Sequence, residues 1–319
     1  MTALPPELFR SRSVFLSPAL LLLLSGLLWL LLGLSRPPHL DEESYLFLGQ
    51  ALQAHPLRPY DWWRPWPPYF TPRDTFYLYA HPPLFLWWSA GWQALLGSES
   101  LWLLRLVALP LVWILCWSWH GLAKLFLRKP LEASAVLFVT PAVGAIFAQS
   151  LMPDLLMGAL LLLALRFGWE TAQAEGLSRA AQCGRMGGAG MLFALASLVK
   201  YPVLGLLPLA LFFPARMPER RLMLAISFWG GAGLLVFSWQ GWTSLQYGTP
   251  HLYYVLSHAG EIARSPFSSR LLGGLTQLGL TVMPPLLLLL SFLEGRWSLR
   301  PRRGLLAGLG WSVWVGLVV

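Results

Sequence analysis

An acidic run, Asp41-Glu42-Glu43, stands out in a chain that is 56% hydrophobic and only 12% charged. A carboxylate held close to other carboxylates can act as a general base for a hydroxyl group. Apolar residues at helical spacing follow the run, beginning at Tyr45, and indicate a surface helix. A second interpretation is that Asp41 only caps this helix and that both glutamates are solvated.

A second acid, Asp154, lies within an apolar stretch and follows Pro153. An ionisable group costs free energy in such a stretch, so it is a candidate functional residue. Asp154 is also suited to cap the helix that begins at this point. Capping and catalysis are compatible, and the sequence leaves both roles open.

Two potential cations lie within two residues of a proline. His81 precedes Pro82-Pro83 and could bind an anion or carry a proton, although an interfacial histidine is the simpler interpretation. Lys200 precedes Tyr201 and could meet a phosphate, or could extend to the interface from a helix end. Aromatic residues at 247–254 could stack on a sugar, but interfacial packing explains them as well.

Long apolar blocks must position these residues, and their lengths indicate an all-α polytopic membrane protein. A membrane-spanning helix needs about 20 apolar residues, which predicts about nine such helices. Their approximate spans are 14–34, 101–122, 132–151, 154–169, 187–200, 201–214, 222–241, 275–293 and 304–319. Prolines interrupt 201–214. No soluble domain is expected, and the first block is expected to remain as an uncleaved helix.

The basic residues predict the orientation of these helices. With the amino terminus inside, every inner segment is basic, as the positive-inside rule requires. These residues are Arg10 and Arg12; Lys124, Arg128 and Lys129; Arg166, Arg179 and Arg185; Arg216, Arg220 and Arg221; and Arg296, Arg300, Arg302 and Arg303. The scheme requires the Trp-rich segment 81–97 to lie flat on the outer surface as an interfacial helix. Two large outer loops then result, at about 35–100 and 242–274.

The net charge of +9 does not indicate nucleic-acid binding, because the basic residues lie in short clusters between apolar blocks. The sequence also contains no nucleotide-binding loop, no zinc-protease motif and no nucleophile elbow. Any donor substrate would therefore have to arrive through the lipid phase.

Several motifs recur in a familiar order between about residues 14 and 290. After the first apolar block come DEESY, an aromatic loop, HPPL, LLRLVALP, a basic turn, MPD and LVKYPVLGLLPLALFF. In this order the sequence resembles the polyprenyl-phosphate-sugar-dependent glycosyltransferases of the C-type membrane fold. It looks most like the bacterial relatives of protein O-mannosyltransferases and of aminoarabinose transferase. Members of this family are commonly longer, so the chain could be a minimal enzyme, a fragment or a degenerate paralogue.

The resemblance implies an inverting sugar transfer from a polyprenyl-phosphate donor to a lipid, protein or glycan hydroxyl. It implies a multi-pass protein of the bacterial inner (plasma) membrane with its site on the outer face. Asp41 would be the general base, with Glu42 and Asp154 orienting the acceptor or holding a divalent cation, and no other cofactor. The substrate- or phosphate-binding residues would be His81, Lys200, Tyr45 and Arg105.

Two other functions fit the same sequence. One is a non-catalytic, lipid-binding membrane subunit of the same fold. The other is a transporter with Asp154 and Lys200 along a substrate path. Transporters tend to place such charges near the bilayer centre. The candidate residues here are expected at the outer boundary, which favours surface chemistry.

Overall fold

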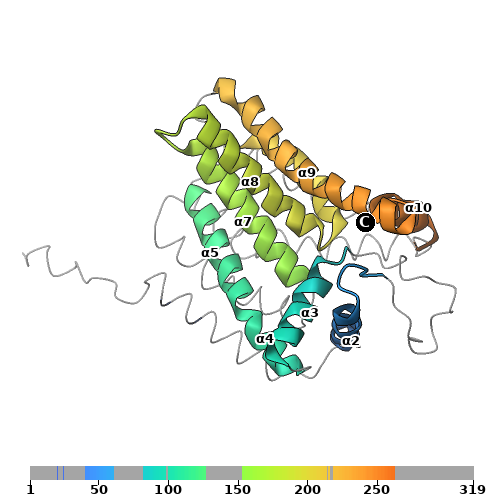
Figure 1. Ribbon diagram of the computed structural model, residues 1–319. Coiled ribbons are helices and arrows are strands. Elements are labelled where there is room, and N and C mark those ends of the chain that lie inside the picture. The colour runs from blue at the N-terminus through green and yellow to red at the C-terminus, as the bar shows by residue number, and fades with distance from the viewer. Residues whose placement is uncertain are drawn as a thin grey trace, which may run out of the picture.

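The computed structural model describes residues 40–60, 82–97, 100–126, 153–213, 215 and 218–262, together with Leu20 and Leu24. Within these residues every regular element is a helix, and no strand occurs (Figure 1). The all-α prediction is confirmed for this part of the chain. The predicted spans at 132–151, 275–293 and 304–319, and nearly all of the span at 14–34, lie outside the described residues.

The described helices range from 3 to 27 residues in length. They are α2 Leu40–Ala54, α3 Leu84–Leu96, α4 Leu101–Val107, α5 Leu109–Phe126, α7 Pro153–Gln173, α8 Arg179–Ser197, the 3₁₀ helices η4 Tyr201–Phe212 and η5 Pro218–Arg220, α9 Arg221–Tyr247 and α10 His251–Ile262. In Figure 1, α5, α7, α8 and α9 run side by side, while α2, α3 and α10 gather at one end of this bundle.

Three helical segments in the described part are long and apolar enough to cross a membrane: Leu101–Leu122, Pro153–Gln173 and Arg221–Tyr247. They correspond to the predicted spans at 101–122, 154–169 and 222–241. Large apolar side chains remain exposed along α9, namely Leu222, Ile226, Leu234, Phe237 and Leu245. The chain is therefore a membrane protein, and the total of about nine spans stays a prediction.

The helix predicted at 187–200 begins earlier than expected, at Arg179. Ser178 caps it, because its Oγ accepts a hydrogen bond of 3.2 Å from the Ala181 amide. Arg185 therefore belongs to the helix and not to the inner loop in which its charge was expected. The polar first turns lack the apolar periodicity on which the prediction depended.

The segment predicted as a membrane helix at 201–214 is instead the 3₁₀ helix η4. Pro202 lies in its first turn and Pro208 in its interior, where proline interrupts α-helical hydrogen bonding. A 3₁₀ helix rises about 2.0 Å per residue, so twelve residues extend about 24 Å. Because a 3₁₀ helix is longer per residue than an α-helix, this short segment is long enough to extend across most of a bilayer.

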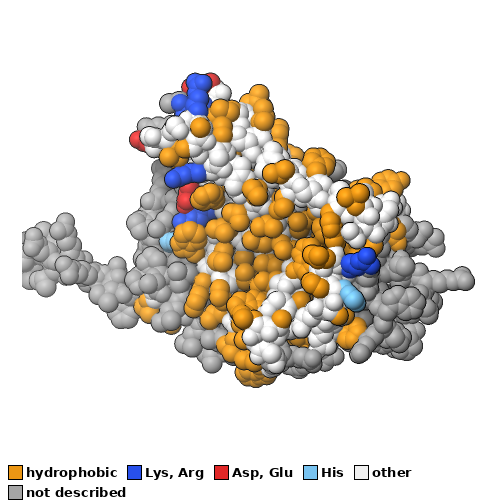
Figure 2. Space-filling view, viewed as in Figure 1, with side chains coloured by type: hydrophobic (Ala, Val, Ile, Leu, Met, Phe, Trp, Pro, Cys, Tyr) orange, Lys and Arg blue, Asp and Glu red, His pale blue; other side chains and the backbone are white. Residues whose placement is uncertain are grey.

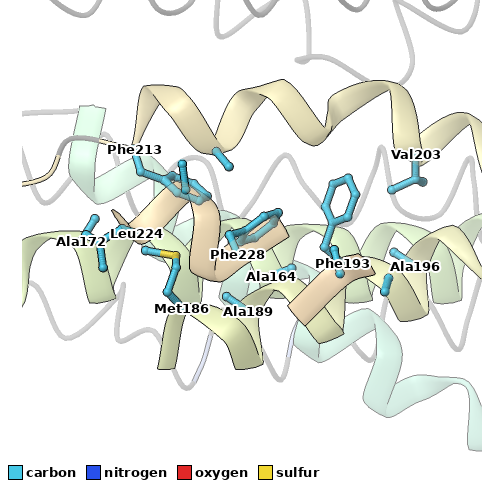
Figure 3. Close-up of a cluster of buried hydrophobic side chains, with 14 of the residues drawn as sticks. Ala164, Ala172, Met186, Ala189, Phe193, Ala196, Val203, Phe213, Leu224 and Phe228 are labelled. Carbon is cyan, nitrogen blue, oxygen red and sulfur yellow. The ribbon is translucent and has the colours of Figure 1, made fainter. Parts of the chain in front are cut away.

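Small residues bring α8 and α9 into close contact. A side chain on Gly190 would collide with the backbone carbonyl of Phe228, and one on Gly231 with the carbonyl of Gly187. Such close approach is typical of helix pairs in membranes. Phe193 and Phe228 then meet edge to face, with ring centroids 5.4 Å apart, inside a buried cluster (Figure 3).

The described bundle has two chemically different ends. At one end Arg220 donates to Gln182 near the starts of α8 and α9, and we call this the Arg220 end. At the other end Lys200 lies at the end of α8, and we call this the Lys200 end. Figure 2 shows Lys and Arg side chains gathered at the Arg220 end and apolar side chains covering the middle of the visible face.

Candidate functional site

Glu42 and Arg105 form a buried ion pair at the Lys200 end. Arg105 Nη2 donates to Glu42 Oε2 at 2.8 Å, and Arg105 Nε donates to Glu42 Oε1 at 3.2 Å. The Glu42 side chain is 0% exposed and that of Arg105 is 1% exposed. This two-point contact holds α2 against α4, across 63 residues of sequence. It also occupies the guanidinium group that the resemblance assigns to a phosphate.

The helix α2 carries the acidic run into this site. It begins at Leu40, so Asp41 is the second residue of the helix and not the residue preceding it. The side chains of Asp41 and Glu43 lie outside the described part of the structure. Tyr45, one turn after Glu42, is buried and meets the Phe85 ring edge to face at 5.0 Å. Its ring therefore packs α2 on α3.

Asp154 and Lys200 form a second ion pair. The sequence had predicted that both residues lie on the same side of the membrane. Lys200 Nζ donates to Asp154 Oδ1 at 2.7 Å, and the two side chains are 22% and 28% exposed respectively. Asp154 lies in the first turn of α7, and Lys200 directly precedes η4. Both charged groups therefore remain within reach of a ligand.

The prolines that follow His81 lie next to this second pair. Pro82 and Pro83 are buried, and the Leu84 amide donates to the Leu198 carbonyl at 3.2 Å. The amino terminus of α3 is thereby attached to the end of α8, two residues before Lys200. His81 itself lies outside the described residues. The 13 residues of α3 are too few to cross a membrane.

One apolar cluster connects the two ion pairs. Its buried members include Leu104, Leu155 and Val199, which are the sequence neighbours of Arg105, Asp154 and Lys200 respectively. Tyr45, one turn after Glu42, belongs to the same cluster. Both ion pairs therefore border the same packed core. The same close-packed side chains therefore support both pairs.

An aromatic network around His251 was not predicted as part of the site. His251 is 0% exposed, and its Nδ1 lies 2.8 Å from the Tyr201 hydroxyl. The Tyr201 hydroxyl also accepts hydrogen bonds from Trp239 Nε1 at 3.0 Å and from Gln240 Nε2 at 3.1 Å. The sequence signals were the aromatic loop at 247–254 and the tyrosine beside Lys200, but their contact could not be read from spacing.

The described residues contain no group of three His, Cys, Asp or Glu side chains that could hold a metal ion. Asp154 faces Lys200 and Glu42 faces Arg105, so the carboxylates of these two candidate acids each meet a cation. The Asp41 carboxylate, which was expected to complete the acidic set, is outside this part of the chain. Binding of a divalent cation therefore stays a prediction.

Comparison with protein-family models, with curated proteins and with solved structures finds no match to this chain. The class defined by the fold is an α-helical membrane protein. The two ion pairs and the aromatic network at the Lys200 end make up its candidate site.

Proposed function

We propose that this chain is a membrane glycosyltransferase that moves a sugar from a polyprenyl-phosphate donor to a hydroxyl acceptor, with inversion at the sugar carbon. The observation that supports this proposal most is the Asp154–Lys200 pair. It is partly exposed, and it lies at the bundle end where α2 presents the acidic run. An ammonium group in this position suits the phosphate of a lipid-linked substrate.

In the proposed reaction Asp41 removes the proton of the acceptor hydroxyl as its oxygen attacks the anomeric carbon. The bond from that carbon to the phosphate oxygen breaks, and the polyprenyl phosphate leaves with the electron pair. Lys200 stabilises the charge on the leaving phosphate, and His81 contacts the same group. Asp154 orients the Lys200 ammonium through their 2.7 Å contact.

The buried pair has a different role in this proposal. Glu42 and Arg105 are engaged with each other and inaccessible to solvent, so we assign them to positioning α2 and not to binding the substrate. Tyr45 supports the same helix from the α3 side. This assignment replaces the direct contacts that the family resemblance implied for these three residues.

We further propose that the Lys200 end faces outward from the plasma membrane of a bacterium. The Arg220 end carries Arg179, Arg185 and Arg221 as exposed basic side chains. Basic residues accumulate on the cytoplasmic side of membrane proteins. A donor in the outer leaflet could then reach Lys200 directly from the lipid.

The test uses the purified full chain in lipid nanodiscs with a panel of radiolabelled polyprenyl-phosphate sugars and membrane extract. Asp41→Asn is expected to lower label transfer at least about 100-fold, as expected for loss of a general base. Glu43→Gln removes a charge from the same run but keeps the proposed base, so it is the matched control and should lower transfer far less than Asp41→Asn.

Two results would change the assignment. Transfer at the normal rate by Asp41→Asn, at equal protein content, would remove Asp41 as the base. Saturable binding of a labelled donor by the unaltered chain, without any transferred product, would instead favour the non-catalytic lipid-binding function.

A further inference from the structure

His251, the first residue of α10, lies in a fully buried position where its ring contacts two phenol hydroxyl groups. Its Nδ1 is 2.8 Å from Tyr201 Oη and 3.4 Å from Tyr60 Oη. The Tyr60 ring also stacks on the imidazole, with centroids 4.7 Å apart. The distances alone do not say which atom of each contact carries the proton.

The surrounding hydrogen bonds decide the direction of the shorter contact. Gln240 Oε1 accepts from the Leu252 amide at 2.8 Å, which fixes the orientation of the side-chain amide. Gln240 Nε2 must then donate to Tyr201 Oη. Trp239 Nε1, which can only donate, supplies a second hydrogen bond to the same oxygen.

Two donors occupy both lone pairs of the Tyr201 oxygen, so its own proton is directed to His251 Nδ1. The histidine ring is therefore an acceptor at Nδ1 and carries its proton at Nε2. A proton on Nδ1 would face an oxygen that has no lone pair left to receive it. The network thus specifies one neutral tautomer of His251.

This network is attached to Lys200 through the backbone. Lys200 has an extended conformation, with φ −148° and ψ 123°, so its side chain and that of Tyr201 point to opposite sides. Lys200 reaches Asp154 on α7, while Tyr201 reaches His251 on α10. The chain reversal between α8 and η4 is thus held from both sides.

We propose that Tyr201 is a positioning residue for the Lys200 ammonium and that the Nε2–H tautomer of His251 holds Tyr201 in place. Without the acceptor at Nδ1, the Tyr201 hydroxyl keeps its two donors but its own proton has no acceptor, so the ring is held less firmly. The backbone at Lys200 then gains freedom, and the contact with Asp154 weakens. The consequence for sugar transfer rests on the proposed function, whereas the effect on Lys200 itself does not.

Substitutions at His251 separate the hydrogen bond from simple packing. Asn places an acceptor oxygen at the same number of bonds from Cα as Nδ1, so His251→Asn should preserve the network. His251→Gln places its acceptor one bond further out, at the Nε2 position, and should not. His251→Phe fills the space without any acceptor. A packing role alone would rank Gln and Phe above the smaller Asn.

The reactivity of Lys200 toward an acetylating reagent reports its contact with Asp154. The chain contains only two other lysines, Lys124 and Lys129, which serve as internal references when peptides are quantified by mass spectrometry. We expect Tyr201→Phe, His251→Gln and His251→Phe to raise Lys200 acetylation about three- to tenfold, the factor that one lost hydrogen bond corresponds to. Asp154→Asn, which removes the partner itself, sets the upper limit.

Two variants should leave Lys200 acetylation unchanged: His251→Asn, and Tyr60→Phe, which removes the more distant phenol hydroxyl. If Tyr201→Phe does not fold, the Asn and Gln variants decide the question by themselves. Equal acetylation of Lys200 in His251→Asn and His251→Gln would overturn the proposal, as would faster acetylation in the Asn variant.

Sugar transfer should be measured on the same preparations. The variants with the most Lys200 acetylation should transfer the least sugar. If acetylation follows the expected order while the unaltered chain transfers no sugar, the positioning role stands and the proposed function fails. If the unaltered chain transfers sugar but Lys200 acetylation is the same in all His251 variants, the proposed function stands and the positioning role is wrong.

Discussion

The two ion pairs at the Lys200 end have the same chemical composition of one carboxylate and one cation, yet they differ in access to solvent. The Glu42–Arg105 pair is closed, with side chains 0% and 1% exposed and two hydrogen bonds between them. The Asp154–Lys200 pair is open, with 28% and 22% exposure and a single contact at 2.7 Å.

This difference in access indicates a division of roles. Removing both charges from water is costly, and a buried pair recovers that cost only through good geometry, such as the two-point contact of Arg105. Such a pair fixes one arrangement of helices and is out of reach of a ligand in solvent. An open pair contributes less to stability, but its cation can move from the carboxylate to an incoming phosphate.

The largest effect is expected when the closed pair is broken. Arg105→Met leaves the Glu42 carboxylate buried without its guanidinium partner. Breaking a buried pair in this way costs about 3–5 kcal/mol. Unfolding of the purified chain in detergent, followed by tryptophan fluorescence against temperature, should show a strongly lowered midpoint and a reduced yield.

The double variant Glu42→Leu/Arg105→Met is the control for this prediction. It removes both charges and fills the site with apolar side chains, so most of the lost stability should return. A single Arg105→Met variant with the midpoint of the unaltered chain would show that the pair does not hold α2 in place.

A smaller effect on stability, but a larger one on activity, is expected at the open pair. Asp154→Asn should change the free energy of unfolding by about 1 kcal/mol or less, as partly exposed pairs do. Under the proposed function, transfer should fall on the order of 100-fold, because the ammonium is no longer oriented toward the leaving group.

Lys200→Met supplies the comparison for Asp154→Asn. If the two residues act as a unit, the double variant should transfer sugar no more slowly than Lys200→Met alone. Unfolding of Asp154→Asn at a midpoint as low as that of Arg105→Met would contradict the division between an open and a closed pair.

The closed pair also shows which features of the structure can and cannot be predicted from the sequence. The spans at 101–122 and 222–241 were predicted because hydropathy is a local property of the chain. The pairing of Glu42 with Arg105 depends on how α2 packs beside α4, which no local pattern specifies. Both residues were named as candidates from the sequence, but their contact with each other was not predicted.

The open pair was easier to anticipate. The alternation of membrane helices predicted that Asp154 and Lys200 share one side, and the structure brings them into contact. His251 was not predicted as part of the site, because its partner Tyr201 lies 50 residues away and belongs to a 3₁₀ helix. Proline interrupts that segment, so its geometry could not be derived from an α-helical pattern.

A third ion pair, at the Arg220 end, gives the smallest expected effect and extends the comparison. Arg166 Nε donates to Glu170 Oε1 at 2.6 Å, one helical turn away, and Glu170 is 47% exposed. The guanidinium group also lies 3.5 Å from the centre of the Trp117 ring and donates to the Trp117 carbonyl. Arg166 therefore keeps two contacts with α5 when the glutamate is neutralised.

Glu170→Gln should accordingly change the free energy of unfolding by less than about 0.5 kcal/mol, the value of an exposed pair one turn apart. The unfolding midpoint in detergent should match that of the unaltered chain, and sugar transfer at the far end should be normal. A loss of stability in Glu170→Gln as large as that in Arg105→Met would mean that exposure does not rank these pairs. The contrast between the closed and the open pair would then need a different physical cause.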